Sequence, residues 1–414
     1  MRRRKPAVIF IFITLFLDIF GIGVIVPVLP KLVEQMSGGD PGAASHAVGW
    51  LGALYALMQF VFSPVLGSLS DRFGRRPVIL LSLLGSGLDY LLLAWAPTLA
   101  WLFVGRIISG ITAANFSAAS AYIADVTPPE KRAAGFGLIG AAFGLGFIAG
   151  PAIGGLLGHY GLRVPFLVAA GITLLNWLYG ALVLPESLAP ENRREFHWKS
   201  VHPIRALQGL ARWPVVASLA WTHFFINVAH NIYPSLWVLY TGERYGWGSR
   251  EVGISLSLVG IMAAIVQAGL AGRIIGFIGE RKGIIVGLLI MAASLAAYGL
   301  ASAPWMVYVI TVIGSFGSIG SPAAQSIITK SAPQDEQGAV QGALNSLTSV
   351  AGIVGPLLWT AMFAFSIKPG SAVPLPGFAF FGAAALTLVG LAMAWRGLSS
   401  AGMERVLSKG SSEG

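Results

Sequence analysis

Twelve long apolar runs, each of about twenty residues, are the feature that most constrains this chain. A helix rises ~1.5 Å per residue and the hydrocarbon core of a bilayer is ~30 Å thick, so runs of this length match what a membrane-spanning helix needs. Of the 414 residues, 55% are hydrophobic, and the mean hydropathy is +0.75. No soluble core could bury so much apolar surface. The sequence therefore predicts an all-α membrane protein with spans at residues 7–29, 47–69, 77–96, 98–122, 134–158, 163–185, 214–241, 250–273, 282–302, 304–328, 338–366 and 377–397.

The two halves of the chain are related by a shift of 205 residues. Under that shift Gly67, Gly74, Arg76 and Gly150-Pro151 fall on Gly272, Gly279, Arg281 and Gly355-Pro356. A repeat with six apolar runs in each half indicates a duplicated bundle. We expect an N-terminal six-helix bundle over 1–185, a cytoplasmic linker over 186–213 and a C-terminal six-helix bundle over 214–414. A short amphipathic helix near 196–210 is one option for the linker.

The net charge of +10 is distributed unevenly along this topology. Most of the 27 Lys and Arg residues fall at the N-terminus, in the tail and in every second loop, on one side of the predicted membrane. On the other side are Lys31, Arg163, Arg244, Arg250 and Lys368. The positive-inside rule then places both termini in the cytoplasm of a multi-pass protein of the cell (inner) membrane. This explanation of the charge excludes nucleic-acid binding.

Composition and motifs argue against enzymatic chemistry. The chain has no cysteine, which excludes disulfides, thiol catalysis and cysteine metal sites. It also lacks HExxH, GxSxG, phosphate-loop and metal-ligand patterns. We expect neither a metal nor a cofactor. A membrane-embedded enzyme and a receptor without transport activity are the alternatives from other classes.

A charge-dense loop, GSLSDRFGRRP, joins the second and third spans. Positive-inside anchoring explains its arginines but not an aspartate between two helices. Such an aspartate can cap a neighbouring helix and exchange partners when the bundles move. The loop therefore predicts a cytoplasmic gate, with Asp125 as a second acid for the same arginines. The gate candidates are Gly67, Asp71, Arg72, Gly74, Arg75, Arg76 and Asp125.

Three charged residues fall inside the spans of the first half. Asp18 lies near the middle of the first span, and Asp89 and Arg106 lie at similar depths in the third and fourth, where they could pair. A charge in hydrocarbon is costly unless it faces a partner or a cavity. One interpretation is a structural ion pair, and the other is a set of proton-coupling groups. Because the repeat replaces Asp89 and Arg106 with Ser294 and Thr311, we place ion coupling in the first half.

Uncharged groups inside the spans complete the candidates. The fifth span carries GxxxGPxxGG, whose small residues allow close helix packing and whose proline bends the helix; its residues are Gly146, Gly150, Pro151, Gly154 and Gly155. Amides and aromatic side chains either bond neighbouring helices or line a cavity for a flat, polyfunctional molecule. The substrate-binding candidates are Gln59, Asn115, Asn231, Tyr233, Trp237, Gln267, Gln325 and Asn345.

These segments together resemble the major facilitator superfamily, and most closely its tetracycline/proton antiporter branch. The resemblance covers nearly the whole chain and is carried by the gate loop, by Leu17-Asp18, by Leu88-Asp89-Tyr90 and by GxxxGPxxGG, the form typical of antiporters. It implies the fold of that superfamily and drug export driven by proton entry through a monomer. The corresponding positions are Asp18, Gln59, Asp71, Asp89, Arg106, Asp125 and Gln267.

The second half departs from the drug-resistance branch. Met291 stands where that branch has an acid in helix 9, and Ala263 where it has a histidine in helix 8. These departures indicate a relative with its own substrate. The leading hypothesis is a proton-coupled antiporter that exports a small amphiphilic compound by alternating access. A nutrient uptake symporter or uniporter of the same fold is the alternative.

Overall fold

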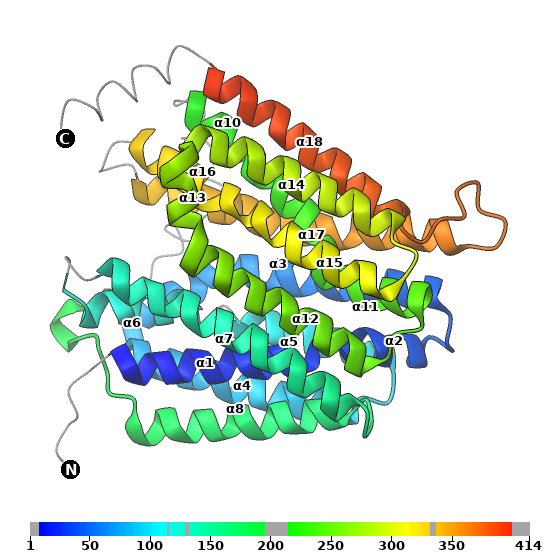
Figure 1. Cartoon of the computed structure of the whole chain (residues 1–414). Coiled ribbons are helices and arrows are strands. Elements are labelled where there is room, and N and C mark those ends of the chain that lie inside the picture. The colour runs from blue at the N-terminus through cyan, green and yellow to red at the C-terminus, as the bar shows by residue number, and fades with distance from the viewer. Residues whose placement is uncertain (1–7, 114–115, 129–131, 195–213, 332–336, 400–414) are drawn as a thin grey trace. The chain divides into compact units, whose positions relative to one another are not determined.

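The computed structural model describes residues 8–113, 116–128, 132–194, 214–331 and 337–399, and every regular element in these ranges is helical (Figure 1). The contacts divide the chain into two compact units. Unit 1 comprises Met1–His202 with Gly246–Gly260, and unit 2 comprises Pro203–Tyr245 with Ile261–Gly414. The amphipathic linker helix expected near 196–210 lies outside the described residues.

Unit 1 contains the first six expected spans. The element η2 (Pro190–Asn192) follows the last of them. The helices are α1 (Val8–Ile25), α2 (Leu29–Met36), α3 (Pro41–Phe73), α4 (Arg75–Trp95), α5 (Leu99–Ala113), α6 (Phe116–Val126), α7 (Arg132–Gly158) and α8 (Val164–Val183). The N-terminal part of α12 (Ser249–Ala264), up to Gly260, also belongs to this unit.

Unit 2 contains the seventh predicted span, the end of the eighth from Ile261 on, and the ninth to twelfth spans. Its elements are α10 (Pro214–His230), α11 (Ile232–Tyr245), the π-helical η5 (Ile265–Leu270), α13 (Ala271–Ile278), α14 (Glu280–Leu300), α15 (Pro304–Gly314), η6 (Ser315–Ile319), α16 (Gly320–Ser331), α17 (Gln337–Ile367) and α18 (Phe378–Ser399). In the described ranges, eleven helical segments are long and apolar enough to cross a membrane. The seventh predicted span is not among these eleven, because it divides at Asn231 into two shorter helices, α10 and α11.

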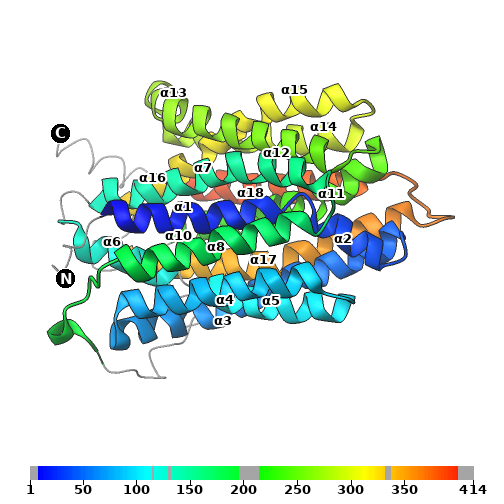
Figure 2. The same cartoon turned by 90° about the horizontal axis from the view of Figure 1, so that it is seen from below.

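Close packing of α1 against α7 and α8 organises unit 1 (Figures 1 and 2). Buried aliphatic residues of α1, among them Ile11, Leu15 and Ile19, join residues of α4 and α6 in one apolar core. Unit 2 repeats this plan with α10 packed against α17 and α18. The apolar side chains that face outward on many helices fit a lipid environment.

The turn before the third expected span of each half uses a glycine with a positive φ. Gly74 (φ 105°) separates α3 from α4, and Gly279 (φ 83°), 205 residues later, separates α13 from α14. Residues with a Cβ rarely adopt this conformation. The repeated glycine therefore places the charged start of α4 and of α14 in the same kind of turn.

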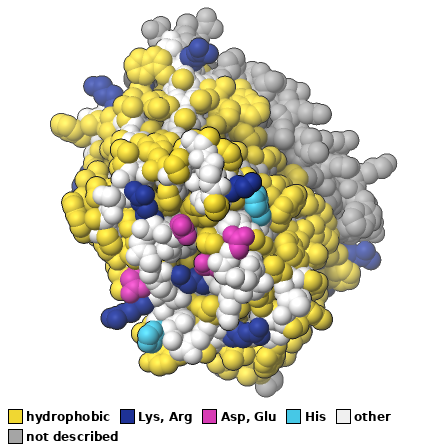
Figure 3. Space-filling view, turned by 90° about the vertical axis from the view of Figure 1, so that its right-hand side faces the viewer, with side chains coloured by type: hydrophobic (Ala, Val, Ile, Leu, Met, Phe, Trp, Pro, Cys, Tyr) yellow, Lys and Arg dark blue, Asp and Glu magenta, His cyan; other side chains and the backbone are white. Residues whose placement is uncertain are grey.

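Charged side chains gather where helices end. On the face seen in Figure 3, Lys, Arg, Asp and Glu lie among backbone and side chains of other types, and apolar side chains cover much of the flanks. Helix ends at a membrane surface carry charges of this kind, whereas the spans avoid them.

Candidate functional site

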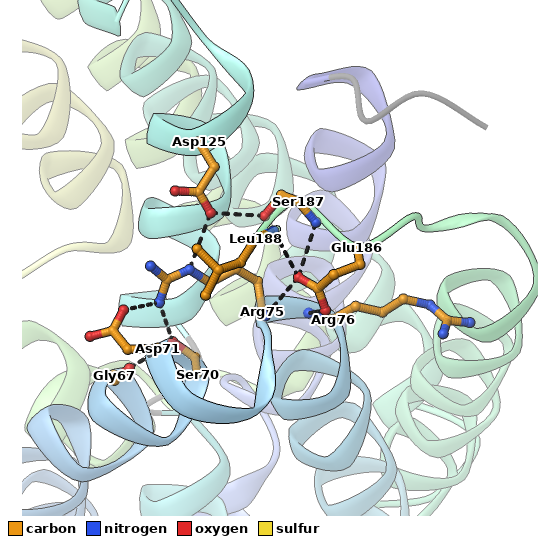
Figure 4. Close-up of polar contacts among 9 residues, drawn as sticks. All are labelled: Gly67, Ser70, Asp71, Arg75, Arg76, Asp125, Glu186, Ser187 and Leu188. Atoms are coloured by element: carbon orange, nitrogen blue, oxygen red, sulfur yellow. Dashed lines mark hydrogen bonds and ion pairs between the residues drawn. The ribbon is translucent and has the colours of Figure 1, made fainter. Parts of the chain in front are cut away.

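Arg75 is the centre of the predicted gate (Figure 4). Its guanidinium pairs with Asp71 on α3 at 2.5 Å, donates to Oδ2 of Asp125 on α6 at 3.2 Å, and donates to the Ser70 hydroxyl at 2.7 Å. The Arg75 side chain is only 9% exposed, whereas that of Asp71 is 41% exposed. The contact of Asp125 with the arginine cluster is confirmed. Of the two acids, Asp71 is the one that water and other groups reach more easily.

Glu186, just after α8, caps the helix that Arg75 begins. Its two carboxylate oxygens accept hydrogen bonds from the backbone N–H groups of Arg75 (2.9 Å) and Arg76 (3.2 Å), and also from those of Ser187 and Leu188 (3.0 Å each). The predicted capping role of Asp71 is therefore wrong for this helix, because Asp71 is engaged by the Arg75 side chain. A Cβ at Gly74 would collide with the Glu186 carboxylate.

The remaining gate candidates lie around this cluster. Arg76 donates to the Ala181 carbonyl of α8 at 2.6 Å, the Arg72 guanidinium lies 5.1 Å from the Phe73 ring, and the Gly67 carbonyl accepts a hydrogen bond from Ser70. A solvent-open hollow of about 600 Å³ lies beside the cluster, lined by Asp71, Arg75, Asp125, Leu188, Glu191, Asn192, Arg193 and Arg194. The loop thus ties α3, α4, α6 and the end of α8 into one polar network.

Unit 2 carries an ion pair at the equivalent positions, with the charges exchanged. Glu280 at the start of α14 accepts from Lys330 on α16 at 2.8 Å and from Ser326 at 2.5 Å. The shift of 205 residues places Glu280 on Arg75 and Lys330 on Asp125. The sequence comparison of charges inside the spans did not reveal this pair, which lies at helix ends. The exposed acid has no counterpart, since Gly276 stands in the place of Asp71, and Ile275 and Phe277 stand in the places of Ser70 and Arg72.

Helix dipoles distinguish the two pairs. An acid at a helix N-terminus and a base at a C-terminus are favourable, and the reverse arrangement is not. Glu280 and Lys330 follow this rule, whereas Arg75 begins α4 and Asp125 lies near the end of α6. The unit 1 pair is placed against both dipoles. At the N-terminus of α4, the negative charge of the Glu186 carboxylate offsets the unfavourable interaction of Arg75 with the helix dipole.

Asp18, Asp89 and Arg106 are all buried inside unit 1, at 3%, 1% and 9% exposure. Asp89 accepts a hydrogen bond from Ser109 at 2.6 Å and lies within electrostatic range of Arg106. In the described part of the chain no ion pair within 4 Å joins Asp89 and Arg106, so the expected pairing is absent. The Arg106 guanidinium instead lies 5.7 Å from the ring centre of Tyr55 on α3. The half-buried Gln59 follows Tyr55 one helical turn later on α3.

Two polar residues of α8 that were not predicted from the sequence lie against the face of α1 that carries Asp18. Asn176 donates to the Thr14 carbonyl at 2.8 Å, and Thr173 lies 3.0 Å from the point where a Gly21 Cβ would be. Thr14, Asp18 and Gly21 share one face of the helix because residues three and four apart lie above one another. Asn176 and Thr173 therefore flank Asp18. Each is fully buried and has one oxygen without a hydrogen-bond partner among the described residues.

The glycines of α7 allow close packing against two neighbouring helices within unit 1, α1 and α12. Gly146, Gly150 and Gly154 face α1, where an added Cβ would meet the backbone or side chains of Ile19 to Val24. Gly155 faces Ser249 and Gly253 of α12. The Ile148 carbonyl, three residues before Pro151, accepts a hydrogen bond from Ser257 of α12 at 3.0 Å. The motif therefore lets three helices approach at backbone distance.

The substrate-binding candidates lie in both units, and each is described in its own. In unit 2, Asn231 donates to the Asn227 carbonyl where α10 ends, and Tyr233 and Trp237 pack edge-on against Tyr298. Trp237 is 2% exposed, so it belongs to an aromatic core. Gln267 lies in the π-helical η5, and Gln325 and Asn345 are exposed. Asn115 lies outside the described residues. Substrate binding by any of these remains a prediction.

An all-helical chain of membrane-spanning length, with buried charges inside a bundle and a charged loop at one end, defines a polytopic membrane transporter. The family model of the Major Facilitator Superfamily matches residues 11–356 and 229–412. The chain belongs to that superfamily, and its members are transporters and not enzymes. This confirms the family resemblance and the fold that it implied.

Relatives and solved structures agree with this assignment. The chain is 42% identical to the class C tetracycline resistance protein of Escherichia coli over 395 residues, which is 95% of this chain and 98% of that protein. It is 40% identical to the class D protein of Salmonella ordonez, over 87% of this chain and 90% of that protein. The crystal structure of the human organic anion transporter MFSD10 has a TM-score of 0.69 at 24% identity, covering 94% of this chain and 98% of that one. That of the nucleoside transporter NupG has a TM-score of 0.75 at 13% identity, covering 95% and 99%.

Proposed function

We propose that this protein is a proton-coupled antiporter that exports a small amphiphilic compound of the tetracycline type by alternating access. The observation that carries the proposal is the buried group of Asp18, Asp89 and Arg106 in unit 1, in a chain 42% identical to a tetracycline resistance protein. Buried acids inside a membrane bundle are costly, and they typically mark ion pathways. The similarity to resistance proteins favours export over nutrient uptake.

In this proposal the buried acids bind protons and thereby bias the equilibrium between two orientations. Protonation removes a charge from an apolar interior, so a conformation that shields the acid from water becomes less costly. Asp18 and Asp89 are the proposed proton sites, with Arg106 setting the local field and Ser109 holding Asp89. The Arg75 cluster acts as the cytoplasmic gate, with Asp71 as the acid that changes partner.

The setting of the cycle is also part of the proposal. The protein works as a monomer in the inner membrane, with both termini in the cytoplasm, and the proton gradient is its only energy source. It needs neither a metal nor a cofactor. The positive-inside distribution of Lys and Arg supports the orientation. The small-residue contacts of α7 with α1 and α12 support an antiporter-type fifth span.

The test is reconstitution of the full chain in liposomes that contain a pH-sensitive dye, challenged with a panel of tetracyclines and other amphiphiles. We expect at least one compound to be taken up with outward movement of protons in the antiport sense. The Asp18→Asn and Asp89→Asn variants should insert normally and lose this coupling. Uptake with no proton movement, or full coupling in both variants, contradicts the proposal.

A further inference from the structure

The internal repeat assigns a counterpart to Asp18 in unit 2. A shift of 205 residues places Asp18 on His223 of α10. The contacts within each unit support this register. Gly150 of α7 lies against Gly23 of α1, and 205 residues later Gly355 of α17 lies against Val228 of α10. The helix α10 is therefore the counterpart of α1, and His223 is a titratable group at the position of the buried acid.

Hydrogen bonds around His223 favour one tautomer of its neutral ring. Its Nε2 lies 2.8 Å from the Thr348 hydroxyl of α17, and that hydroxyl donates to the Leu344 carbonyl at 3.0 Å. A hydroxyl has one proton to donate. With that proton on Leu344, the Thr348 oxygen is an acceptor for Nε2–H, which favours the Nε2–H tautomer. The neutral imidazole then has a lone pair on Nδ1, the nitrogen able to bind a proton.

In the described part of the chain, no charged side chain forms an ion pair with the His223 imidazole within 4 Å. The helices packed against α10 are α11, α16, α17 and α18, and α17 has no ionisable residue within its described range. The ionisable groups on the other packed helices are Tyr233, Tyr240, Glu243, Arg244, Tyr245, Lys330 and Arg396, with His230 on α10 itself. Among the described residues, the charge state of His223 therefore depends on its access to water and not on an ionic partner.

We propose that His223 is a second proton-binding group of the transport cycle, held in the Nε2–H tautomer by Thr348. The inference rests on the proton coupling proposed above. Nδ1 takes a proton from water on one side of the membrane, forms an N–H bond and a cationic ring, and returns that proton to water on the other side. The His223 side chain is half-buried in a membrane-spanning helix, where an imidazolium without water is costly, so the proton binds and leaves when water reaches the ring. This ties protonation to the orientation of the protein.

Two substitutions separate titration from the hydrogen bond. His223→Gln keeps an amide N–H able to reach Thr348 but cannot titrate, and Thr348→Val keeps the side-chain shape and the imidazole but removes the acceptor. We expect H223Q to lose the limb of the transport pH profile between about pH 5.5 and 7.5, the range in which imidazole titrates. T348V should keep that limb with a displaced midpoint. The exposed His46 of α3 is the matched control, and H46N should leave the profile unchanged.

A purely structural role of His223 predicts the opposite pattern, with H223Q like the native protein and T348V impaired. That result would overturn the inference. Protonation is also measured directly by NMR of the full chain in lipid nanodiscs with ¹⁵N-labelled histidine, where the signal missing from H223Q belongs to His223. Titration of that signal in the same pH range supports the assignment, and a ring that stays neutral to about pH 5 refutes it. This readout does not require transport. If native liposomes move no protons, the proposed function fails, and the NMR titration still decides whether His223 binds one.

Discussion

Two glycines of α7 offer a controlled test of how closely this helix must approach α1. A Cβ at Gly150 would lie 2.7 Å from Cα of Gly23 and 3.0 Å from the carbonyl oxygen of Phe20, whereas a Cβ at Gly140 would meet nothing within 4 Å. Carbon atoms pack at ~3.5–4.0 Å, so Gly150→Ala must separate the two helices by about 1 Å. Overpacking of this kind costs about 1–3 kcal/mol.

Both alanines gain the same helix propensity, about 1 kcal/mol over glycine. The difference between the two variants therefore isolates the steric cost. We expect G140A to be slightly more stable than the native protein, and G150A to be less stable than G140A by about 1–3 kcal/mol. The assay is reversible unfolding of the purified full chain in mixed micelles by increasing SDS, followed by the fluorescence of its 12 tryptophans. If the two variants unfold at the same SDS fraction, α1 and α7 do not pack at backbone distance and the reasoning is wrong.

Three further predictions concern the charged helix ends. Glu186→Ala removes the cap of α4 and should destabilise the chain by about 1–2 kcal/mol, with slower transport, while E186Q retains part of the cap; equal stability of E186A and native protein would contradict the capping role. Asp71→Asn should lower the turnover rate in liposomes more than the apparent substrate affinity, because the exposed acid serves the gate and not the substrate; an unchanged rate would leave only a structural role. In unit 2, the double variant E280R/K330D copies the polarity of Arg75 and Asp125. Its free energy of unfolding should exceed that of either single variant but fall below that of the native protein by about 1–2 kcal/mol, because its charges oppose the helix dipoles. A double variant no more stable than the single variants would show that the pair contributes nothing to stability.

The apolar pattern of the sequence predicted the positions of the helices well, but it did not predict that one span is divided into two helices. The runs predicted at 77–96 and 163–185 correspond to α4 (Arg75–Trp95) and α8 (Val164–Val183) within two residues. The run at 214–241 is instead two helices that meet at Asn231, where a side chain that bonds the preceding turn interrupts the pattern. Apolar length alone cannot show such a break, since both helices are apolar.

The candidate site was only partly readable in advance. Gly74, Arg75 and Asp125 could be singled out because charges beside a glycine turn are rare in such a chain. Glu186 could not, since an acid after the last span of a bundle looks like an ordinary surface residue until the chain folds back onto α4. The same holds for Asn176, which is one of several polar residues within spans and gains meaning only from its contact with Thr14.

The apolar runs and the positions of Lys and Arg by themselves determine that this chain crosses a membrane many times, in two related halves. Hydrocarbon thickness and the high cost of burying peptide groups leave a helix as the only solution for each run. Which polar groups meet inside the bundles was decided by tertiary structure alone. Glu186 with α4, Asn176 with Thr14, Glu280 with Lys330 and His223 with Thr348 are contacts between residues 50 to 162 positions apart in the sequence. No local pattern encodes such pairs, because they depend on how each helix is rotated and how closely glycine lets its neighbour approach.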